Sequence, residues 1–393
     1  MNERLNSGAC LPEDRGRAVL IGRAWVPAFD GPVPVCVRGE AIHDLTAIAA
    51  TASGLLELDD PVAAIRAADL PRLAGLDEML ANSAWNLRDE ARPWFLAPCD
   101  LQAIKASGVT FVSSMLERVI EEQARGDPSK AEAVRAAIVA VIGDDLADVR
   151  PGSPEALRLK DVLIAQHAWS QYLEVGIGPD AEIFTKSQPM SAVGIGAEIG
   201  IHPRSEWNNP EPEIVLAVNS RGGCVGATLG NDVNLRDFEG RSALLLGRGK
   251  DNNGSCSIGP FIRLIDGSFG LEDIRKADLA LEIAGADGFR LEAVSSMSRI
   301  SRDPLDLIAQ TMGNTHQYPD GMVLFTGTMF APTKDRDRPG EGFTHKPGDR
   351  VAISSDKLGT LANTVHHADR IAPWSFGVIA LMRNLASRQL LPH

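Results

Sequence analysis

The pattern of hydrophobic and polar positions divides the chain into strand-rich and helix-rich stretches. Short runs with a two-residue period occupy 18–26 and 33–39, on either side of an FDGP turn, and predict paired strands. Further along, apolar residues recur every three or four positions over 113–126, 127–146 and 151–175. This spacing is typical of amphipathic helices. The chain therefore combines a β-rich beginning with a helical stretch.

Strand patterns return in the second half of the chain, separated by Gly, Pro and Asn turns, and a helical pattern over 376–391 follows them. The fold class that this order predicts is α+β and mostly β. We expect a flexible arm at 1–17, a small N-terminal α+β domain at 18–99, and a catalytic domain at 100–393.

One hairpin carries the first candidate chemistry. The run PEPEIVLAV is followed by the turn NSRGG and by a second run, CVGATLGNDV, that can pair back on the first. Glu211 and Glu213 are two residues apart, so their side chains point to the same face of a strand. A hairpin folded about Arg221 would place 211 opposite 231 and 213 opposite 229, with Asp232 beside the glutamates. We expect a bulge at Gly230 to turn Asp232 inward.

Three converging carboxylates repel one another unless a positive charge lies between them. A site made only of oxygen ligands suits a hard divalent cation such as Mg²⁺ or Mn²⁺. The alternative is an acidic hairpin end that faces solvent, and the spacing by itself leaves both interpretations open.

Composition narrows the class of partner. The formal net charge is −13 and the pI is near 5.1, which argues against nucleic acid or an anionic membrane, because both require a basic surface. A small molecule is the expected partner. The five cysteines are scattered and form no CxxC pair, which favours reduced thiols in a cytoplasmic protein. No stretch has the length and apolar character of a membrane span.

Several further motifs occur in a fixed order along the second half of the chain. They are IFTKSQPMSAVG, PEPEIVLAV, GNDVNLRDFEG, LLGRGKDNNGSCSIGPFI, VLFTGTMFAP and GFTHKPGDRVAISSDKLGTLANTV. In this order they resemble the fumarylacetoacetate hydrolase superfamily, over roughly residues 180–365. The resemblance implies a mixed β-sandwich roll preceded by a small β-rich domain, and a divalent metal as cofactor.

The resemblance also implies roles for individual residues. The residues that would bind the metal are Glu211, Glu213 and Asp232. The catalytic residues would be Lys250 and Lys186. The residues that would contact the substrate are Thr328, Arg236 and Ser187. Arg236 could equally orient a carboxylate from behind. The base that removes a proton from the substrate stays open among Lys186, Lys250, Glu182 and a metal-bound water.

One stretch departs from the family's hydrolases. These carry a Tyr-x-Asp-His motif that helps to activate water, whereas the counterpart here, GVTFVSSM, contains neither Asp nor His. Elimination of water is therefore favoured over hydrolysis. Within the superfamily the chain is most similar to dehydratases of 2-keto-3-deoxy sugar acids in oxidative pentose breakdown. The implied reaction converts 2-keto-3-deoxy-D-pentonate, derived from D-xylonate or D-arabinonate, to 2-oxoglutarate semialdehyde.

Two alternatives remain open. The first is a C–C bond hydrolase or decarboxylase acting on acylpyruvates or oxaloacetate, which would use the same metal. The second is a non-catalytic protein that retains the fold. Family members are usually dimers, so we expect a homodimer or higher homo-oligomer, with the apolar helix 376–391 as a candidate interface.

Overall fold

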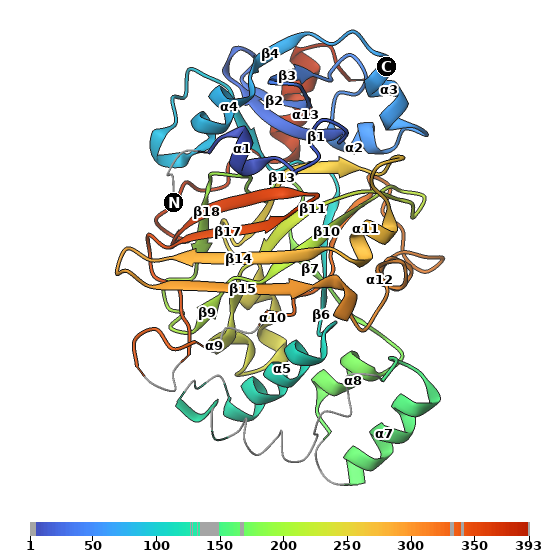
Figure 1. Ribbon diagram of the computed structural model, residues 1–393, viewed down its shortest axis with the longest axis vertical. Helices are drawn as coiled ribbons and strands as arrows, with labels where there is room; N and C mark the ends of the chain where they lie inside the picture. Colours follow the sequence, from blue (N-terminus) through green and yellow to red (C-terminus); the bar gives the residue numbers. More distant parts are fainter. Residues whose placement is uncertain are drawn as a thin grey trace.

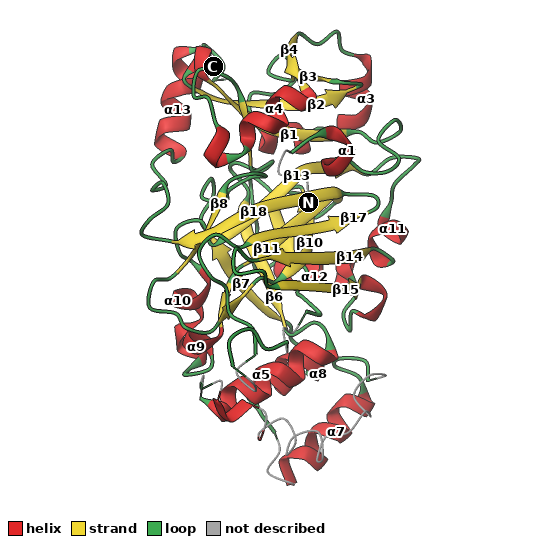
Figure 2. Cartoon of the chain, turned by 60° about the vertical axis from the view of Figure 1, so that its left-hand side comes forward, coloured by secondary structure: helices red, strands yellow, loops and turns green. Residues whose placement is uncertain are grey.

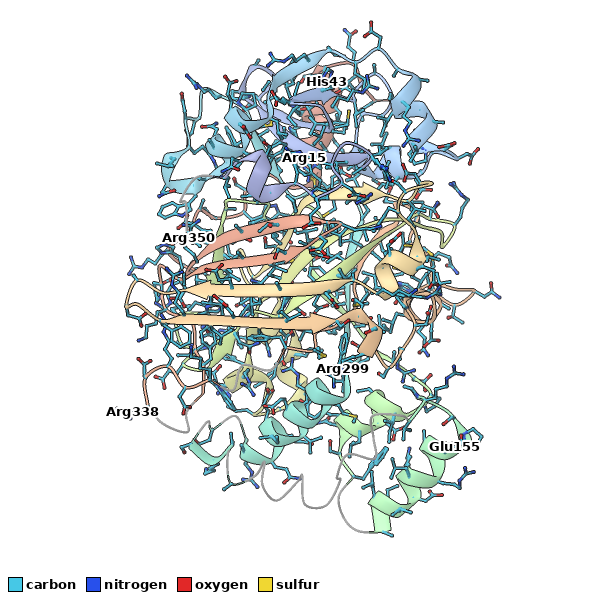
Figure 3. The ribbon with its side chains drawn as sticks, in the orientation of Figure 1. Arg15, His43, Glu155, Arg299, Arg338 and Arg350 are labelled. Atoms are coloured by element: carbon cyan, nitrogen blue, oxygen red, sulfur yellow. The ribbon has the colours of Figure 1, made fainter. Side chains whose placement is uncertain are left out.

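The structure, a computed structural model, describes residues 5–125, 127, 129–131, 133, 149–165, 169–330, 334–338 and 342–391. Most of the helix predicted over 127–146, and residues 1–4 of the predicted arm, lie outside the described residues. The molecule is elongated, with His43 on β3 near one end and Glu155 on α7 at the other (Figure 3).

The centre of the molecule is an 11-stranded sheet. Its strands, in spatial order, are β4 (Arg72–Gly75), β3 (Ala41–Asp44), β2 (Gly31–Arg38), β1 (Leu20–Val26), β13 (Cys256–Leu264), β11 (Cys224–Asp232), β10 (Pro212–Val218), β16 (Met322–Phe325), β6 (Ala103–Gly108) and β7 (Glu182–Ser187), with β5 (Trp94–Leu96) paired to β1. Neighbours are antiparallel except for β16 and β6, which run parallel. All residues of β10 and β13 are buried, as their nearly continuous apolar runs require.

A second, five-stranded sheet lies against this one and closes a sandwich (Figure 1). Its strands are β15 (Arg290–Ser296), β14 (Asp278–Ala284), β17 (Arg350–Ser355), β18 (Gly359–His367) and β8 (Glu198–Ile201), and a separate short pair joins β9 (Asn208–Asn209) to β12 (Asn234–Leu235). Side chains from both large sheets, among them Leu216, Leu229 and Ile353, form one hydrophobic cluster between them. The α+β class expected from the pattern is confirmed.

Helices lie at the two ends of the molecule and along its sides (Figure 2). They are α1 (Ser7–Cys10), α2 (Ala52–Leu56), α3 (Pro61–Ala67), α4 (Leu76–Ser83), α5 (Val112–Ala124), α7 (Pro154–Ala165), α8 (Gln171–Ile177), α9 (Arg236–Glu239), α10 (Leu246–Lys250), α11 (Leu271–Arg275), α12 (Pro304–Thr311) and α13 (Val378–Ser387). Helices α5, α7 and α8 gather at the end opposite β2–β4. None of the described helices combines the length and the apolar composition that a membrane crossing requires.

The N-terminal strands belong to the central sheet, because β1 pairs with β13. The last helix, α13, returns to this end, where Asn384 donates hydrogen bonds to the carbonyls of Phe29 and Asp30. The described part of the arm also packs, since Cys10 is buried and Arg263 forms an ion pair with Asp14. The division into arm, small domain and catalytic domain stays a prediction.

The predicted hairpin forms, but its register differs by one residue. Strands β10 and β11 place Pro212 opposite Asn231 and Glu213 opposite Gly230, and the irregularity lies between Ala217 and Val218, near the turn. The expected register, and the bulge expected at Gly230, are therefore wrong. The extra residue near the turn shifts the rest of β11 by one position, which places Asp232 directly across from Glu211.

The glycine at 230 has a packing role instead. A Cβ atom there would lie 2.3 Å from Cε1 of Phe325 and 2.5 Å from Cγ2 of Val215, both buried. We predict that Gly230→Ala lowers the free energy of unfolding by about 1–3 kcal/mol, the usual cost of overpacking a core. The measurement is denaturant unfolding, with Gly267→Ala as the control because its Cβ would meet nothing within 4 Å. Equal midpoints for the two variants would contradict this account.

Candidate functional site

The open end of the β10–β11 hairpin faces a cavity beside β6, β7 and helices α5, α8, α9 and α10. It is lined by Ser107, Gly108, Val109, Arg118, Tyr172, Glu182, Phe184, Glu211, Glu213, Asp232, Glu239, Ala243, Leu246, Lys250, Gly327 and Thr328. No histidine is among these described lining residues. The cavity therefore lies between the acidic end of the hairpin and residues from several other elements.

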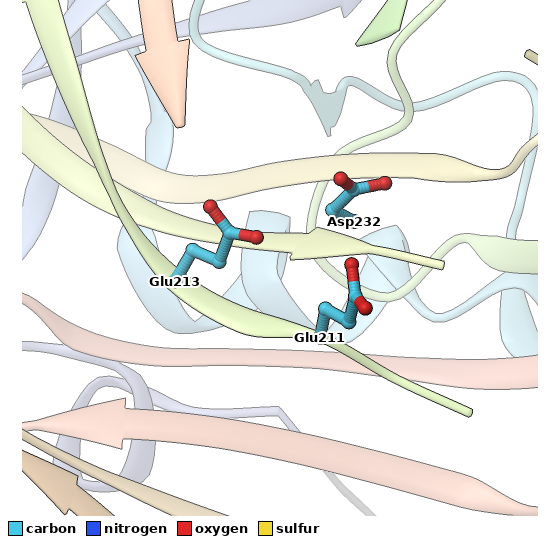
Figure 4. Close-up of side chains that lie close together, drawn as sticks. All are labelled: Glu211, Glu213 and Asp232. Atoms are coloured by element: carbon cyan, nitrogen blue, oxygen red, sulfur yellow. The ribbon is translucent and has the colours of Figure 1, made fainter. Parts of the chain in front are cut away.

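Glu211, Glu213 and Asp232 converge in this cavity (Figure 4). One carboxylate oxygen of each lies within 4.8 Å of one from each of the others, and all three residues are buried. The backbone N–H of Asp232 donates to the carbonyl of Glu211 at 3.0 Å, which fixes the two strands at this point. The three acids at the end of the hairpin therefore form a buried cluster and do not face solvent.

Lys250 ends helix α10 and reaches between two of these acids. Its Nζ lies 2.5 Å from Oε2 of Glu211 and 3.0 Å from Oδ2 of Asp232. Burial would lower the pKa of this amine, but the carboxylates of Asp232, Glu211 and Glu239 raise it above the ordinary lysine value. Lys250 is therefore a charged group on the cavity wall, where it can face a developing negative charge on a ligand.

Lys186 lies behind the acids and is not among the described residues that line the cavity. Its side chain is fully buried, and Nζ is 2.8 Å from Oδ1 of Asp232. The same amine donates to the backbone carbonyls of Val233, at 3.3 Å, and Lys250, at 2.5 Å. Lys186 thus connects an acid on β11 to the end of α10. Burial would raise the pKa of Asp232, and the two lysines outweigh it and hold that pKa below its usual value.

The third acid is held by the TGT bend that follows β16. The N–H of Gly327 donates to Oε2 of Glu213 at 2.6 Å. Gly327 has a φ of 90°, and a Cβ atom there would lie 2.0 Å from Oγ1 of Thr110, so glycine is required. Thr328 lines the cavity, and its hydroxyl accepts a hydrogen bond from the N–H of Phe330 at 3.1 Å.

Two other predicted site residues lie outside the described lining. Arg236 is buried in ion pairs with Glu121, at 2.7 Å, and Glu117, at 3.1 Å, and its guanidinium lies 4.2 Å from the centre of the Trp207 ring. Both acidic partners of Arg236 belong to helix α5. Ser187 shares hydrogen bonds with Ser191 and Asp251.

Two charged residues that line the cavity, Arg118 and Glu239, were not predicted from the sequence as site residues. Arg118 of α5 donates to Oε1 of Glu211 and to Oε2 of Glu239, both at 2.5 Å, and forms a 3.0 Å ion pair with Glu121. Glu239 ends α9 and is buried. The signal for Glu239 was present in the quoted motif GNDVNLRDFEG, whereas Arg118 belongs to a helical pattern that predicts only an amphipathic surface.

Among the described residues that line the cavity, acidic side chains outnumber basic side chains. Burial, followed by the charges of Asp232 and Glu211, raises the pKa of Glu213 well above its usual value. Burial also raises the pKa of Glu182, and raises that of Glu239 to about 7. Three convergent carboxylates with this excess of negative charge fit a hard divalent cation, and the buried oxygens of Glu211, Glu213 and Asp232 would hold it.

Comparison with known proteins identifies the family of this chain. Residues 165–366 match the family described as fumarylacetoacetate (FAA) hydrolase C-terminal, which is more than half of the chain. The protein belongs to this family, and the resemblance noted in its motifs is confirmed. The matched segment contains the three acids and Lys250, but not Arg118.

Two curated relatives are dehydratases. One, from Haloferax volcanii, is named "Probable 2-keto-3-deoxyxylonate dehydratase" and is 32% identical over 195 residues, which cover 49% of this chain and 63% of the relative. The other, 2-dehydro-3-deoxy-D-arabinonate dehydratase from Saccharolobus solfataricus, is 31% identical over 190 residues, or 48% of this chain and 60% of the relative. The chain thus spans about three fifths of the length of these relatives.

Solved structures show the same fold over a longer span. A 2-keto-3-deoxy-D-arabinonate dehydratase in its apo form has a TM-score of 0.62 and 22% identity, and the alignment covers 88% of this chain and 99% of that one. The structure of that dehydratase complexed with magnesium and 2,5-dioxopentanoate has a TM-score of 0.61 and 21% identity, with 88% and 99% covered. The fold expected from the family is confirmed.

The raised pKa of Glu213 predicts how a cation should act on stability. A buried acid with a raised folded-state pKa binds more protons in the folded than in the unfolded state, so stability falls as pH rises above the usual value of 4.5. We predict that the metal-free protein loses thermal stability between about pH 5 and pH 8, and that Mg²⁺ raises the melting temperature more at the higher pH.

The control is Glu213→Gln, which removes both the titrating group and one of the three candidate ligands of the cation. This variant should show a weaker pH dependence and a much smaller shift with Mg²⁺ in the same thermal-melt series. A Mg²⁺ shift that is independent of pH, or is retained in Glu213→Gln, would contradict the assignment of this acid.

Proposed function

We propose that the protein is a Mg²⁺-dependent hydro-lyase that converts 2-keto-3-deoxy-D-pentonate to 2-oxoglutarate semialdehyde, which is 2,5-dioxopentanoate. The observation that carries this proposal is the convergence of Glu211, Glu213 and Asp232 with Lys250 on one buried cavity. The names of the similar dehydratases support the substrate class and the metal.

The acids and the lysine have separate tasks in this proposal. Mg²⁺, or Mn²⁺ in its place, would supply Lewis-acid polarisation of the 2-keto group, which makes the C3 protons acidic. Glu211, Glu213 and Asp232 would hold the cation. Lys250 would balance the negative charge that develops on the substrate when C3 is deprotonated. Lys186 would keep Asp232 and the end of α10 in place.

The proton acceptor for C3 must line the cavity, which Lys250 and Glu182 do. Lys250 already contacts two carboxylates and is held in its charged form, so it is a poor base. Glu182 lies at the start of β7 opposite Gly108, where a Cβ atom would lie 1.8 Å from the Glu182 Oε2. Glycine at 108 therefore leaves room for this carboxylate, and we assign it the role of base. Thr328 would contact the carboxylate or keto group of the substrate.

Elimination is preferred over hydrolysis because no histidine is among the described residues that line the cavity. The side chains of Ser113 and Ser114, in the stretch that replaces the family's Asp-His motif, lie outside the described residues. The substrate supplies its own leaving hydroxyl, so the site needs no activated water. The pathway in which this reaction would take place is oxidative pentose catabolism. The five free thiols support a cytoplasmic location.

The reaction is tested with purified protein, Mg²⁺ and D-glycero-2-keto-3-deoxypentonate. We expect 2-oxoglutarate semialdehyde to form, followed through its oxidation to 2-oxoglutarate, and we expect a chelator to abolish its formation and added Mg²⁺ to restore it. The competing assay offers an acylpyruvate and oxaloacetate. Rapid cleavage of either, without turnover of the pentonate, would favour the C–C hydrolase or decarboxylase instead.

We also propose that the protein forms a homodimer through α13. Three apolar side chains on this helix are exposed, Val378, Ile379 and Met382, with exposed fractions of 41%, 66% and 53%. Light scattering at micromolar concentration should give about twice the 42.0 kDa chain mass, and Ile379→Glu should reduce it to one chain. A wild-type monomer, or a dimer unchanged by Ile379→Glu, would rule out this interface.

A further inference from the structure

Glu239 has one carboxylate oxygen that accepts no hydrogen bond from any described group. Its Oε2 accepts a hydrogen bond from Arg118, whereas Oε1 is buried and accepts none among the described residues. Nζ of Lys250 lies 3.7 Å from Oε1, beyond hydrogen-bond distance. A buried carboxylate oxygen on a cavity wall that accepts no hydrogen bond is costly unless a ligand hydrogen-bonds to it.

The position of this carboxyl is determined by its surroundings. Gly249, on α10, leaves space for it, because a Cβ atom there would lie 2.9 Å from Cγ of Glu239. Arg118 fixes the other oxygen and also binds Glu211, which is one of the three convergent acids. Glu239 therefore keeps a set distance from the proposed cation site without being one of its three acids.

We propose that Glu239 is a catalytic residue that donates the proton to the C4 hydroxyl as it leaves. This inference rests on the proposed dehydration. In the step, the electron pair of the deprotonated C3 forms the C3–C4 double bond, the C4–O bond breaks, and the Glu239 proton completes the departing water. The proton taken from C3 reprotonates the carboxylate left on Glu239, so no further reactant is needed. A C5 proton of the resulting 3,4-unsaturated acid then moves to C3, and the C4–C5 enol so formed tautomerises to the semialdehyde.

Other lining groups are less suited to this task. Lys250 already contacts Glu211 and Asp232. Burial raises the pKa of Tyr172 far above its ordinary value, which makes it a weak donor. The pKa of Glu239, about 7, lets the carboxyl hold a proton at neutral pH and release it. Glu182 lies on β7, and its carboxylate is left for the C3 proton.

The test separates the two halves of the reaction. In Glu239→Gln the amide keeps its size and its contact with Arg118 but has no proton to transfer. We expect water loss to fall about 100-fold or more, as loss of a general acid does, while exchange of the C3 protons with D2O, followed by NMR, continues at a rate near that of the wild type. The Kd for Mn²⁺, from paramagnetic titration, should stay within about threefold.

A second substrate tests proton donation directly. The analogue with fluoride in place of the C4 hydroxyl needs less help from an acid, so Glu239→Gln and Glu239→Asp should eliminate fluoride at rates within about tenfold of the wild type. The matched control is Glu121→Gln, which removes another buried partner of Arg118 that is not among the described lining residues. Its rate should change by the same factor for both substrates.

The outcomes are distinguishable. Water loss by Glu239→Gln within tenfold of the wild type, or equal loss of exchange, water release and fluoride release in a variant that still binds Mn²⁺, would overturn the role of Glu239. Absence of both exchange and dehydration in the wild-type protein would instead remove the proposed function, and this inference with it.

Discussion

The burial of several carboxylates within one cavity is the constraint on which the rest of this site depends. Each carboxylate taken out of water must meet a cation or a hydrogen-bond donor, or keep its proton. The described structure meets this need with Arg118, Lys186, Arg236, Lys250 and the N–H of Gly327. These partners come from helices α5, α9 and α10, from strand β7 and from a glycine bend, so the charge balance also determines how the elements meet.

Much of the acidic centre was predictable from sequence because its causes are local. The two-residue period that places Glu211 and Glu213 on one face belongs to the strand itself, and a Gly- and Asn-rich turn predicts the hairpin that brings Asp232 near them. The register was wrong by one because the bulge lies near the turn, between Ala217 and Val218, and not at Gly230. Strand β11 also pairs with β13, whose sequence lies outside the hairpin, and that pairing has a register shift of its own between Ala227 and Leu229.

The rest of the site depends on contacts between distant segments. Arg118 and Glu239 are separated by 121 positions, and their ion pair exists because α5 packs beside α9. For Lys186 the family resemblance implied a catalytic role, and the structure places its Nζ 2.8 Å from Oδ1 of Asp232 and outside the described lining of the cavity. Spacing predicts which side chains share a face of one strand, whereas the direction of a side chain between layers is decided by packing. For the same reason Arg236 and Ser187 lie outside the described lining.

Helix α5 contributes a charged partner to the acidic centre from outside the family-matched segment. The sheet carries the three acids and Lys186, while Arg118 comes from a segment that precedes the family-matched residues 165–366. Its guanidinium is the link between the acidic centre and Glu239. The charge balance of the acidic centre thus draws on sequence outside the family-matched segment. A change in α5 can alter how Glu211 and Glu239 are held, while the strand pairing that assembles the three acids stays intact.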